Sequence, residues 1–373
     1  MLHLDIPTIE QFRQLASQRS DACVSIYLET TPLSQESGTA RTELGNLFRT
    51  AAAQLTEAGL DKRRLLQLQE HIDDLVDDDE FWRLQANSLC VLATPDAIRT
   101  FRLANALSPT VQVSERFHLK PLLRAITFPH AAFVLALSEN GVRLLEVLPE
   151  GPPVEIRVAG LPKDAASAAG KASINDRSPS GRIHGAEGQK VRLAQYARKV
   201  DAALRPVLAG RHTPIFLAAS DPLASIYHSV NSSADLVAET ITGTHDRTPD
   251  AELAAAARHG LDALYAAQVA EFAALFATRG DQGRSTTDLG QVGHAAAFGA
   301  IDTMLVDIDG VIPGTFDDAT GAITLADEPG ADSYGVADAI AMRALATGAR
   351  VMGVRKADIP GGADVAAILR YAV

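Results

Sequence analysis

A glycine followed directly by a glutamine, Gly188-Gln189, is the place in this sequence whose residue types are best suited to chemistry. Gly185 and Gly188 permit backbone conformations with positive φ, so the chain can approach a ligand closely there. A glutamine amide held at such a point can orient a water molecule, and the first-turn amides of a following helix can hold phosphate. Because Gly-Gln pairs are frequent in proteins, the pattern by itself favours an ordinary surface loop.

The segment around this pair has a charge opposite to that of the whole chain. Residues 161–200 contain eight Lys and Arg and three Asp and Glu, a local charge of +5 in a chain of net charge −12. The basic residues of this segment are Lys163, Lys171, Arg177, Arg182, Lys190, Arg192, Arg198 and Lys199. The acidic total excludes a general nucleic-acid coat, whereas the basic segment suits one local contact with a polyanion. A solvated loop and helix face is the alternative.

The composition is that of a globular protein, with 47% hydrophobic and 21% charged residues, and 373 residues predict two or three domains. Cys23 and Cys90 have no His or Cys at ligand spacing, so we expect neither a zinc site nor a disulfide scaffold. We see no signal peptide and no apolar run near the roughly 20 residues that cross a bilayer. The expected protein is soluble and cytoplasmic.

Hydrophobic periodicity divides the chain into three α/β segments. The first ends at residue 127, and the second begins with β-rich runs on either side of Asn140-Gly141, a strong hairpin signal. Residues 161–189 lack periodicity and are rich in Ala, Ser, Gly and Pro, which predicts a long, mobile loop before a helix that starts at Lys190. Residues 116–124 are expected to connect domains, and Trp82 to anchor a core.

The stretch 181–200 resembles the Gly-Gly-Gln loop and following basic helix of archaeal and eukaryotic class-I peptide-chain release factors. In that family a His-Gly-x-Gly-Gly-Gln segment precedes the helix. His184, Gly185, Gly188 and Gln189 fall in place here, and Glu187 replaces the first glycine of the tripeptide. Other parts of the chain are also similar to that family, namely the hairpin at 133–147, the segment 292–307 and the two closing segments 348–354 and 361–371. At the end of the chain the resemblance implies a strand, a Gly-Gly turn, a helix and a final strand.

The resemblance covers residues 128–373 and fits best the bacterial branch of the superfamily that includes these release factors and Pelota. It implies an α/β (α+β) protein of three domains. These would be an N-terminal α/β domain at 1–127, an RNase H-like middle domain at 128–274, and a C-terminal α/β domain like kink-turn-binding ribosomal proteins at 275–373. Residues 1–127 show no match to the codon-reading domain and contain no Asn-Ile-Lys-Ser motif.

The function that the resemblance implies is codon-independent hydrolysis of the peptidyl-tRNA ester on stalled ribosomes. Gln189 would position water, and the site would comprise Gln189, Gly188, Glu187, Gly185 and His184. RNA would be bound by basic residues of the segment, namely Arg177, Arg182, Lys190, Arg192, Arg198 and Lys199. The partners would be the ribosome and tRNA or peptidyl-tRNA, with no membrane, metal or cofactor. Cleavage of the tRNA end and a non-catalytic ribosome- or RNA-binding module, favoured by Glu187, remain alternatives.

A second motif is typical of a different enzyme class. The segment 303–315 looks like the first motif of haloacid-dehalogenase phosphatases, in which Asp307 would be the nucleophile, Asp309 the acid/base, and Mg²⁺ the metal. Only 64 residues follow Asp309, and no Lys lies between it and the acidic pair Asp327-Glu328. A strand that ends in an Asp-Gly turn is therefore the favoured interpretation.

Overall fold

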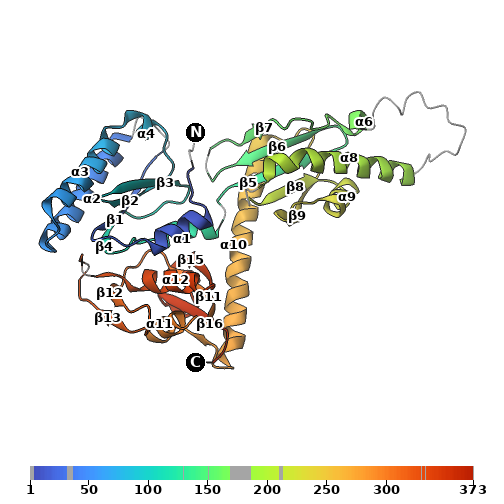
Figure 1. The fold of residues 1–373 in the computed structure, drawn as a ribbon. Coiled ribbons are helices and arrows are strands. Elements are labelled where there is room, and N and C mark those ends of the chain that lie inside the picture. Colours follow the sequence, from blue (N-terminus) through green and yellow to red (C-terminus); the bar gives the residue numbers. More distant parts are fainter. Residues whose placement is uncertain are drawn as a thin grey trace, which may run out of the picture. The chain divides into compact units, whose positions relative to one another are not determined.

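The computed structural model describes residues 4–31, 37–128, 130–149, 151–168, 186–209, 213–328, 330–331 and 333–372. The chain forms two compact units, the first from Met1–Phe128 with Ala266–Val373 and the second from Pro129–Tyr265. Both units combine helices with β-sheet (Figure 1), which confirms the predicted mixed class. The predicted boundary after residue 127 lies beside a unit boundary, while the division into three domains stays a prediction.

The N-terminal part of unit 1 is an antiparallel sheet with helices packed on one face. The strands, in the order β3-β2-β1-β4, are β1 (Cys23–Glu29), β2 (Ser88–Thr94), β3 (Ala97–Leu103) and β4 (Thr110–Ser114). The helices on this face are α2 (Ser37–Glu57), α3 (Lys62–Asp77) and α4 (Asp79–Arg83), whereas α1 (Ile9–Ser17) packs on the opposite face. Trp82 is buried in the core, and its indole N–H donates to Leu75 O at 2.8 Å, so it is the expected core anchor.

Residues 116–124 differ from the simple connector that the sequence suggested. They lead into helix α5 (Lys120–Thr127), whose apolar residues Leu122 and Leu123 are buried. His118 and Lys120 are buried as well, with 3% and 1% of their surface exposed. A lysine is almost never this buried unless its ammonium group has hydrogen-bond or ion-pair partners. We therefore expect the ammonium group of Lys120 to be bound by neighbouring polar groups.

The C-terminal part of unit 1 contains two sheets and shares a hydrophobic core with α1 and α5. One sheet has the order β10-β16-β11-β15, with β10 (Ser285–Thr286), β11 (Ile301–Asp307), β15 (Arg350–Val354) and β16 (Val365–Leu369). The other has the order β13-β12-β14, with β12 (Pro313–Phe316), β13 (Ile323–Leu325) and β14 (Tyr334–Gly335). The helices are α11 (Leu289–Ala297), α12 (Val336–Ala346) and the 3₁₀ turns η2 (Lys356–Asp358) and η3 (Pro360–Gly362).

The closing segment corrects one expectation. Gly361 and Gly362 have φ of 72° and 64°, so they form the turn that the sequence suggested. The expected helix after this turn is not formed, because β16 begins at Val365 and pairs with β11 in the middle of the sheet. The run of small and β-branched residues in β16 is buried on both faces, which a central strand requires.

Asp307 lies at the end of β11 and acts there as a turn residue. Its Oδ2 accepts the N–H of Gly310 at 2.8 Å, its Oδ1 accepts the N–H of Asp309 at 3.3 Å, and the residue is 3% exposed. Within the described ranges, no group of three or more His, Cys, Asp or Glu side chains could hold a metal ion. The geometry therefore supports the Asp-Gly turn rather than a phosphatase nucleophile.

Unit 2 is a five-stranded mixed sheet in the order β7-β6-β5-β8-β9, covered by helices. Its strands are β5 (Ala132–Leu137), β6 (Val142–Val147), β7 (Val154–Ile156), β8 (Ile215–Ala219) and β9 (Leu236–Thr242). Its helices are α6 (Ala165–Ala168), α8 (Ala186–Leu208), α9 (Leu223–Val230) and the first part of α10 (Asp250–Gly280). β5, β6 and β7 pair antiparallel, β8 pairs in parallel with β5, and β9 pairs in parallel with β8. The RNase H-like character that the resemblance implies for this domain stays a prediction.

Two hydrophobic cores hold the helices of unit 2 on the sheet. Leu193, Tyr196 and Val200 of α8 pack with α9 on one face, and Leu253 and Ala257 of α10 pack on the other face. By length and composition α10 could also cross a membrane, with a mean hydropathy of 1.2 and 6% of that window buried. No other helix in the described part of the chain meets this criterion, and one such helix is weak evidence of a membrane protein.

Candidate functional site

Gln189 lies in the first turn of helix α8, which begins at Ala186 and not at Lys190 as the sequence suggested. The backbone of Glu187 is already helical there, Gly188 is buried, and the Gln189 side chain is exposed. Glycine costs about 1 kcal/mol relative to alanine inside a helix, and glutamate costs less. Glu187, in the place where the resemblance has a glycine, therefore favours a helix that reaches back over this motif.

A hydrogen bond fixes the Gln189 side chain to the tip of the β5–β6 hairpin. Its Nε2 donates to Glu139 Oε1 at 3.2 Å, which leaves the carbonyl oxygen of the amide available as an acceptor. Glu139 also accepts the N–H of Ala165 at its backbone oxygen, at 2.9 Å, so the hairpin tip contacts the start of α6 as well. Lys199 of α8 donates to Ala168 O at 2.5 Å and holds the other end of α6. Gln189 is thus held directly by the hairpin tip, and α6 links that tip to α8.

The loop after β9 also contacts the hairpin tip. Asn140 Nδ2 donates to Asp246 Oδ2 at 2.8 Å. Hydrogen bonds from Ser138 and Asn140 lower the pKa of the Asp246 carboxyl below its ordinary value. Arg143 donates to the backbone oxygens of His245 and Thr248 and so fixes this loop to β6.

A cavity of about 650 Å³ opens beside the hairpin tip. Its wall includes the polar side chains Ser138, Asn140, Arg143, Glu155, Lys163, His245, Asp246 and Arg247. This volume and the convergence of polar groups fall within the range of small-ligand sites. Because Glu139, at the hairpin tip, is the hydrogen-bond partner of Gln189, the cavity and the glutamine amide share one edge of unit 2.

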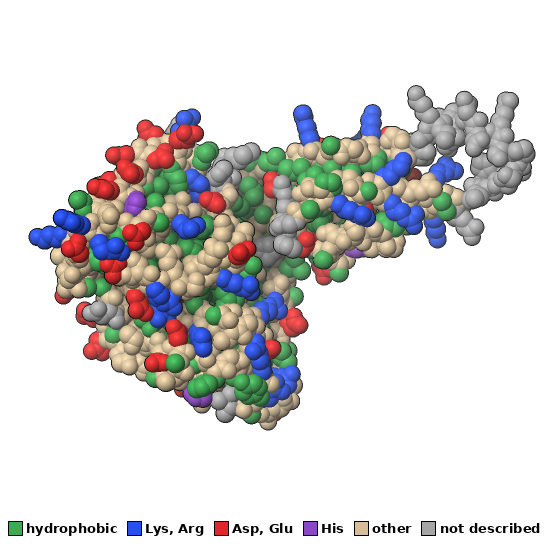
Figure 2. All heavy atoms as spheres, in the orientation of Figure 1, with side chains coloured by type: hydrophobic (Ala, Val, Ile, Leu, Met, Phe, Trp, Pro, Cys, Tyr) green, Lys and Arg blue, Asp and Glu red, His purple; other side chains and the backbone are tan. Residues whose placement is uncertain are grey.

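Four of the predicted RNA-binding residues lie on the exposed face of α8, namely Lys190, Arg192, Arg198 and Lys199. Figure 2 shows basic side chains gathered over the region of this helix. Lys199 has a second role, because its ammonium group also binds the end of α6. Arg177, Arg182, His184 and Gly185 lie outside the described residues, as does the side chain of Glu187. The structure therefore brings together only Gly188, Gln189 and the α8 cations among the predicted residues.

Glu139 was missed by the sequence reasoning. In the sequence it belongs to a Ser-Glu-Asn-Gly turn, where any exposed polar residue satisfies the hairpin. Fifty positions separate it from Gln189, and no local pattern connects the two. Asp246 pairs with Asn140 of the hairpin across 106 positions, and no local pattern connects these two residues either.

Residues 129–267 match the family model described as bacterial archaeo-eukaryotic release factor family 11. This segment is a bacterial archaeo-eukaryotic release factor-like domain. The match spans all of unit 2 and includes the hairpin tip, the cavity wall and the first turn of α8. The resemblance inferred from His184, Gly185, Gly188 and Gln189 is confirmed at the level of the family.

Several solved structures are similar to this chain at low identity. An archaeal translation termination factor, aRF1, has 13% identity over 97% of this chain and 96% of that chain, with a TM-score of 0.24. Dom34 of S. cerevisiae, a translation termination-like factor, has 10% identity over 77% of this chain and 75% of that chain, with a TM-score of 0.42. Archaeal Pelota in a ribosome-bound model has 11% identity over 77% and 78%, with a TM-score of 0.41. A comparison with curated proteins gave no match, and TM-scores this low say nothing about function.

Proposed function

We propose that this release factor-like protein is a cytoplasmic factor that binds the ribosome and hydrolyses the peptidyl-tRNA ester without reading a codon. The observation that carries the proposal is the family match over 129–267, within which Gln189 is exposed and held at the hairpin tip. The carbonyl oxygen of its amide is free to accept a hydrogen bond from a water molecule. Positioning of a nucleophilic water is a contribution that a single side chain can make in an otherwise RNA-built site.

The reaction proceeds as an ordinary ester hydrolysis. The oxygen of the positioned water attacks the carbonyl carbon of the ester, and the bond from that carbon to the tRNA 3′ oxygen breaks. The proton of the water passes to the leaving oxygen, so the products are a peptide with a free carboxyl group and a tRNA with a free 3′ hydroxyl. First-turn N–H groups of α8 lack partners within the helix and can stabilise the developing negative charge.

A non-catalytic ribosome-binding module is the second candidate function. It is favoured by the extension of α8 over Glu187 and Gly188 and by the hydrogen bond that engages Gln189 Nε2. In this case the basic face of α8 would bind rRNA or tRNA phosphates, and the glutamine would contribute only to the shape of the hairpin tip.

Ribosome co-sedimentation combined with analysis of the tRNA distinguishes these functions. The full chain is mixed with ribosomes stalled on a labelled peptidyl-tRNA, and the peptide and the tRNA 3′ end are analysed after sedimentation. Released peptide with an intact tRNA supports hydrolysis, whereas a shortened tRNA supports cleavage of the tRNA end. Co-sedimentation without either product supports the binding module, and failure to co-sediment at low salt contradicts both proposals.

We expect reversal of two α8 charges, Lys190→Glu with Arg192→Glu, to weaken ribosome binding about tenfold or more at ~100 mM salt and to flatten its salt dependence. Both side chains are exposed, so the fold should be retained. The matched control is Lys62→Glu with Arg63→Glu, two exposed cations in the first turn of α3. Co-sedimentation across a salt series measures the effect, and equal losses in both variants would show that only the total charge matters.

A further inference from the structure

Two aromatic side chains are exposed in unit 1 at one end of the sheet β10-β16-β11-β15, where β11 and β15 begin and β16 ends. Phe298 is 58% exposed and Tyr371 is 54% exposed, whereas every other Phe, Tyr and Trp side chain in the described part of the chain is buried or half-buried. The antiparallel pairing of β11 with β16 extends toward both residues, because Arg370 N donates to Ala300 O at 2.8 Å. Two exposed rings on paired segments indicate an interaction surface more strongly than a single exposed residue does.

The side chain of Arg370 connects the loops at this end of the sheet. Its Nη1 donates to Gly299 O at 2.9 Å, and its Nη2 donates to Gly348 O at 3.0 Å. The loop after α11 and the loop after α12 are therefore both fixed to the segment that carries Tyr371.

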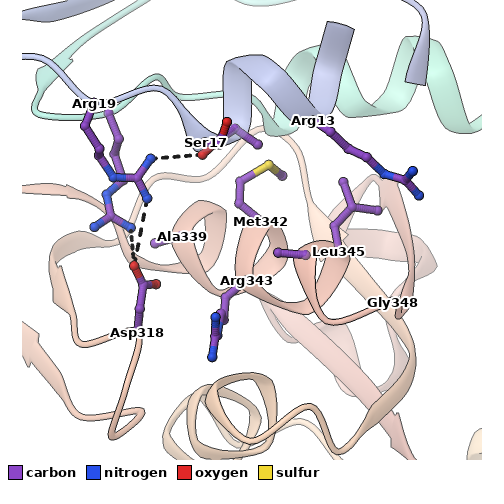
Figure 3. Close-up of a pocket in the computed structure, with 12 residues that line it drawn as sticks. Arg13, Ser17, Arg19, Asp318, Ala339, Met342, Arg343, Leu345 and Gly348 are labelled. Carbon is purple, nitrogen blue, oxygen red and sulfur yellow. Dashed lines mark hydrogen bonds and ion pairs between the residues drawn. The ribbon is translucent and has the colours of Figure 1, made fainter. Parts of the chain in front are cut away.

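The ring of Phe298 is supported by two neighbours. The imidazole of His294, one turn earlier on α11, lies against it with the ring centroids 4.7 Å apart and an angle of 46° between the planes. Figure 3 shows Arg343 extending from α12 away from Met342, and its Nη2 donates at 2.9 Å to Ala297 O, one residue before Phe298. Because the backbone beside the ring is already fixed, a ligand that stacks on it would lose little affinity to the ordering of the protein.

The charge around the two rings is opposite to that of the whole chain. We call the segments 292–301, 343–351 and 365–372 the aromatic end of unit 1. They contain three arginines, one histidine and no Asp or Glu, in a chain of net charge −12. Arg343 and Arg370 donate to backbone carbonyl oxygens, which leave their positive charges in place, and the side chain of Arg350 is exposed. A polyanion therefore complements this surface.

Aromatic rings beside cations are the combination that proteins use to bind unpaired nucleic acid. The bases stack on the rings, and the arginines bind the phosphates. A strand carries one phosphate per nucleotide, so the arginines need not converge on a single group. A protein partner would favour aliphatic surface around the rings, but the other exposed residues of the aromatic end are only Arg, His, Ala and Gly.

We propose that the aromatic end of unit 1 binds single-stranded RNA, with bases stacked on Phe298 and Tyr371 and phosphates bound by Arg350 and Arg370. RNA is the nucleic acid expected for a chain that matches a release factor family. Stacking accepts any base, so the binding should depend little on sequence. The site lies in unit 1 and does not depend on catalysis by Gln189.

Fluorescence anisotropy of the full chain with a labelled ten-nucleotide RNA tests the proposal. Every protein carries Lys190→Glu with Arg192→Glu, so that the basic face of α8 contributes little to binding. We expect this parent protein to bind the RNA and to bind an abasic ribose-phosphate strand of equal length at least about fivefold more weakly, because that strand has nothing to stack. Equal binding of the two strands contradicts the proposal. Absence of RNA binding at ~100 µM protein and low salt also contradicts it, and would leave the surface to a protein partner.

Phe298→Ala should raise the Kd for the RNA about fivefold or more, and Phe298→Leu should do the same because leucine is apolar but has no ring. Phe298→Tyr keeps the ring and should bind as the parent protein does. The matched control is Leu66→Ala on α3, which removes a side chain that is also 58% exposed and should leave the Kd unchanged. The proposal is wrong if Phe298→Ala or Phe298→Leu binds the RNA as tightly as the parent protein.

Arg350→Gln tests the phosphate contact separately. It should reduce the slope of log Kd against log salt concentration by about 0.7, the value for one phosphate contact on a single strand. Arg99→Gln, at an exposed arginine of β3, is the matched control and should keep the slope of the parent protein. Equal slopes for Arg350→Gln and Arg99→Gln would contradict the assignment of Arg350 to a phosphate.

Discussion

Gln189→Ala is expected to slow peptide release from stalled ribosomes about 100-fold and to leave ribosome binding unchanged. The expectation follows if the amide positions the attacking water, because loss of one positioning or charge-stabilising group in an active site costs this order of rate. The side chain is exposed and makes its one described hydrogen bond to Glu139, so its removal should not disturb packing. Single-turnover release of labelled peptide measures the rate, and co-sedimentation measures binding.

Gln195→Ala is the control for this variant. Gln195 is an exposed glutamine on the same helix, six positions after Gln189, and no hydrogen bond joins its side chain to the hairpin tip in the described part of the chain. The variant removes the same side-chain atoms from the surface of the same helix. We expect it to release peptide at the wild-type rate. If Gln189→Ala releases peptide as fast as wild type and Gln195→Ala, catalysis by the amide is wrong and the binding-module interpretation stands.

Much of the secondary structure could be predicted because its signals are local. The strands β5 and β6 are runs of β-branched and apolar residues on either side of Asn140-Gly141, and both lie where the sequence predicts the hairpin. The capping box of Thr8 and Gln11 likewise marks the start of α1. The sheet β13-β12-β14 could not be predicted, because its strands have two to four residues and include Pro313 and Gly314.

The start of α8 shows why a motif can be recognised while its conformation is not. The glycines at 185 and 188 suggested a loop, yet glycine is only about 1 kcal/mol worse than alanine inside a helix. Glu187 and Gln189 are good helix formers, and packing of Leu193 and Tyr196 on the sheet supplies the rest. Packing of α8 on the sheet cannot be read from the sequence around residues 185–189.

Only the part of the candidate site that depends on local sequence could be predicted. Gln189 and the α8 cations follow from a motif and a charge count, both visible in the sequence. Glu139 and the cavity depend on which strands pair, and the pairing of β5 with β8 joins residues about 80 positions apart. The same holds for the aromatic end of unit 1, since Phe298 and Tyr371 lie on segments that meet only through the pairing of β11 with β16.

Asp338→Ala is expected to destabilise unit 1 by about 3–5 kcal/mol. Asp338 belongs to α12, and its Oδ1 accepts the N–H groups of Leu119 and Lys120 at 2.7 and 2.6 Å, where α5 begins without a side-chain cap of its own. The alanine variant leaves two buried N–H groups without an acceptor. Urea denaturation at pH 7 measures the loss, which would be a large part of the ~5–15 kcal/mol of a typical domain.

Asp338→Asn keeps an acceptor oxygen and should cost less than the alanine variant, by an amount that depends on pH. Burial raises the pKa of Asp338 to about 6, against the nearby charges of Lys120 and Arg116. The folded protein therefore holds a proton between pH 4 and 6 that the unfolded chain lacks, so this carboxyl favours unfolding more as the pH rises, by up to ~1.4 kcal/mol per unit.

The imidazole of His118 has the opposite effect on stability. Its Nδ1 lies 3.7 Å from Asp338 Oδ1, and burial lowers its pKa to about 3, so the unfolded chain binds the extra proton between pH 3 and 6.5. Its contribution to stability rises with pH and offsets that of Asp338 between pH 4 and 6. We therefore expect wild type to show little pH dependence from this pair, whereas Asp338→Asn, with His118 alone, should become steadily more stable from pH 4 to 6. The free energy of unfolding of each protein is measured by urea denaturation at several pH values. If it changes with pH in the same way for both proteins between pH 4 and 6, the opposing pKa shifts of Asp338 and His118 are wrong.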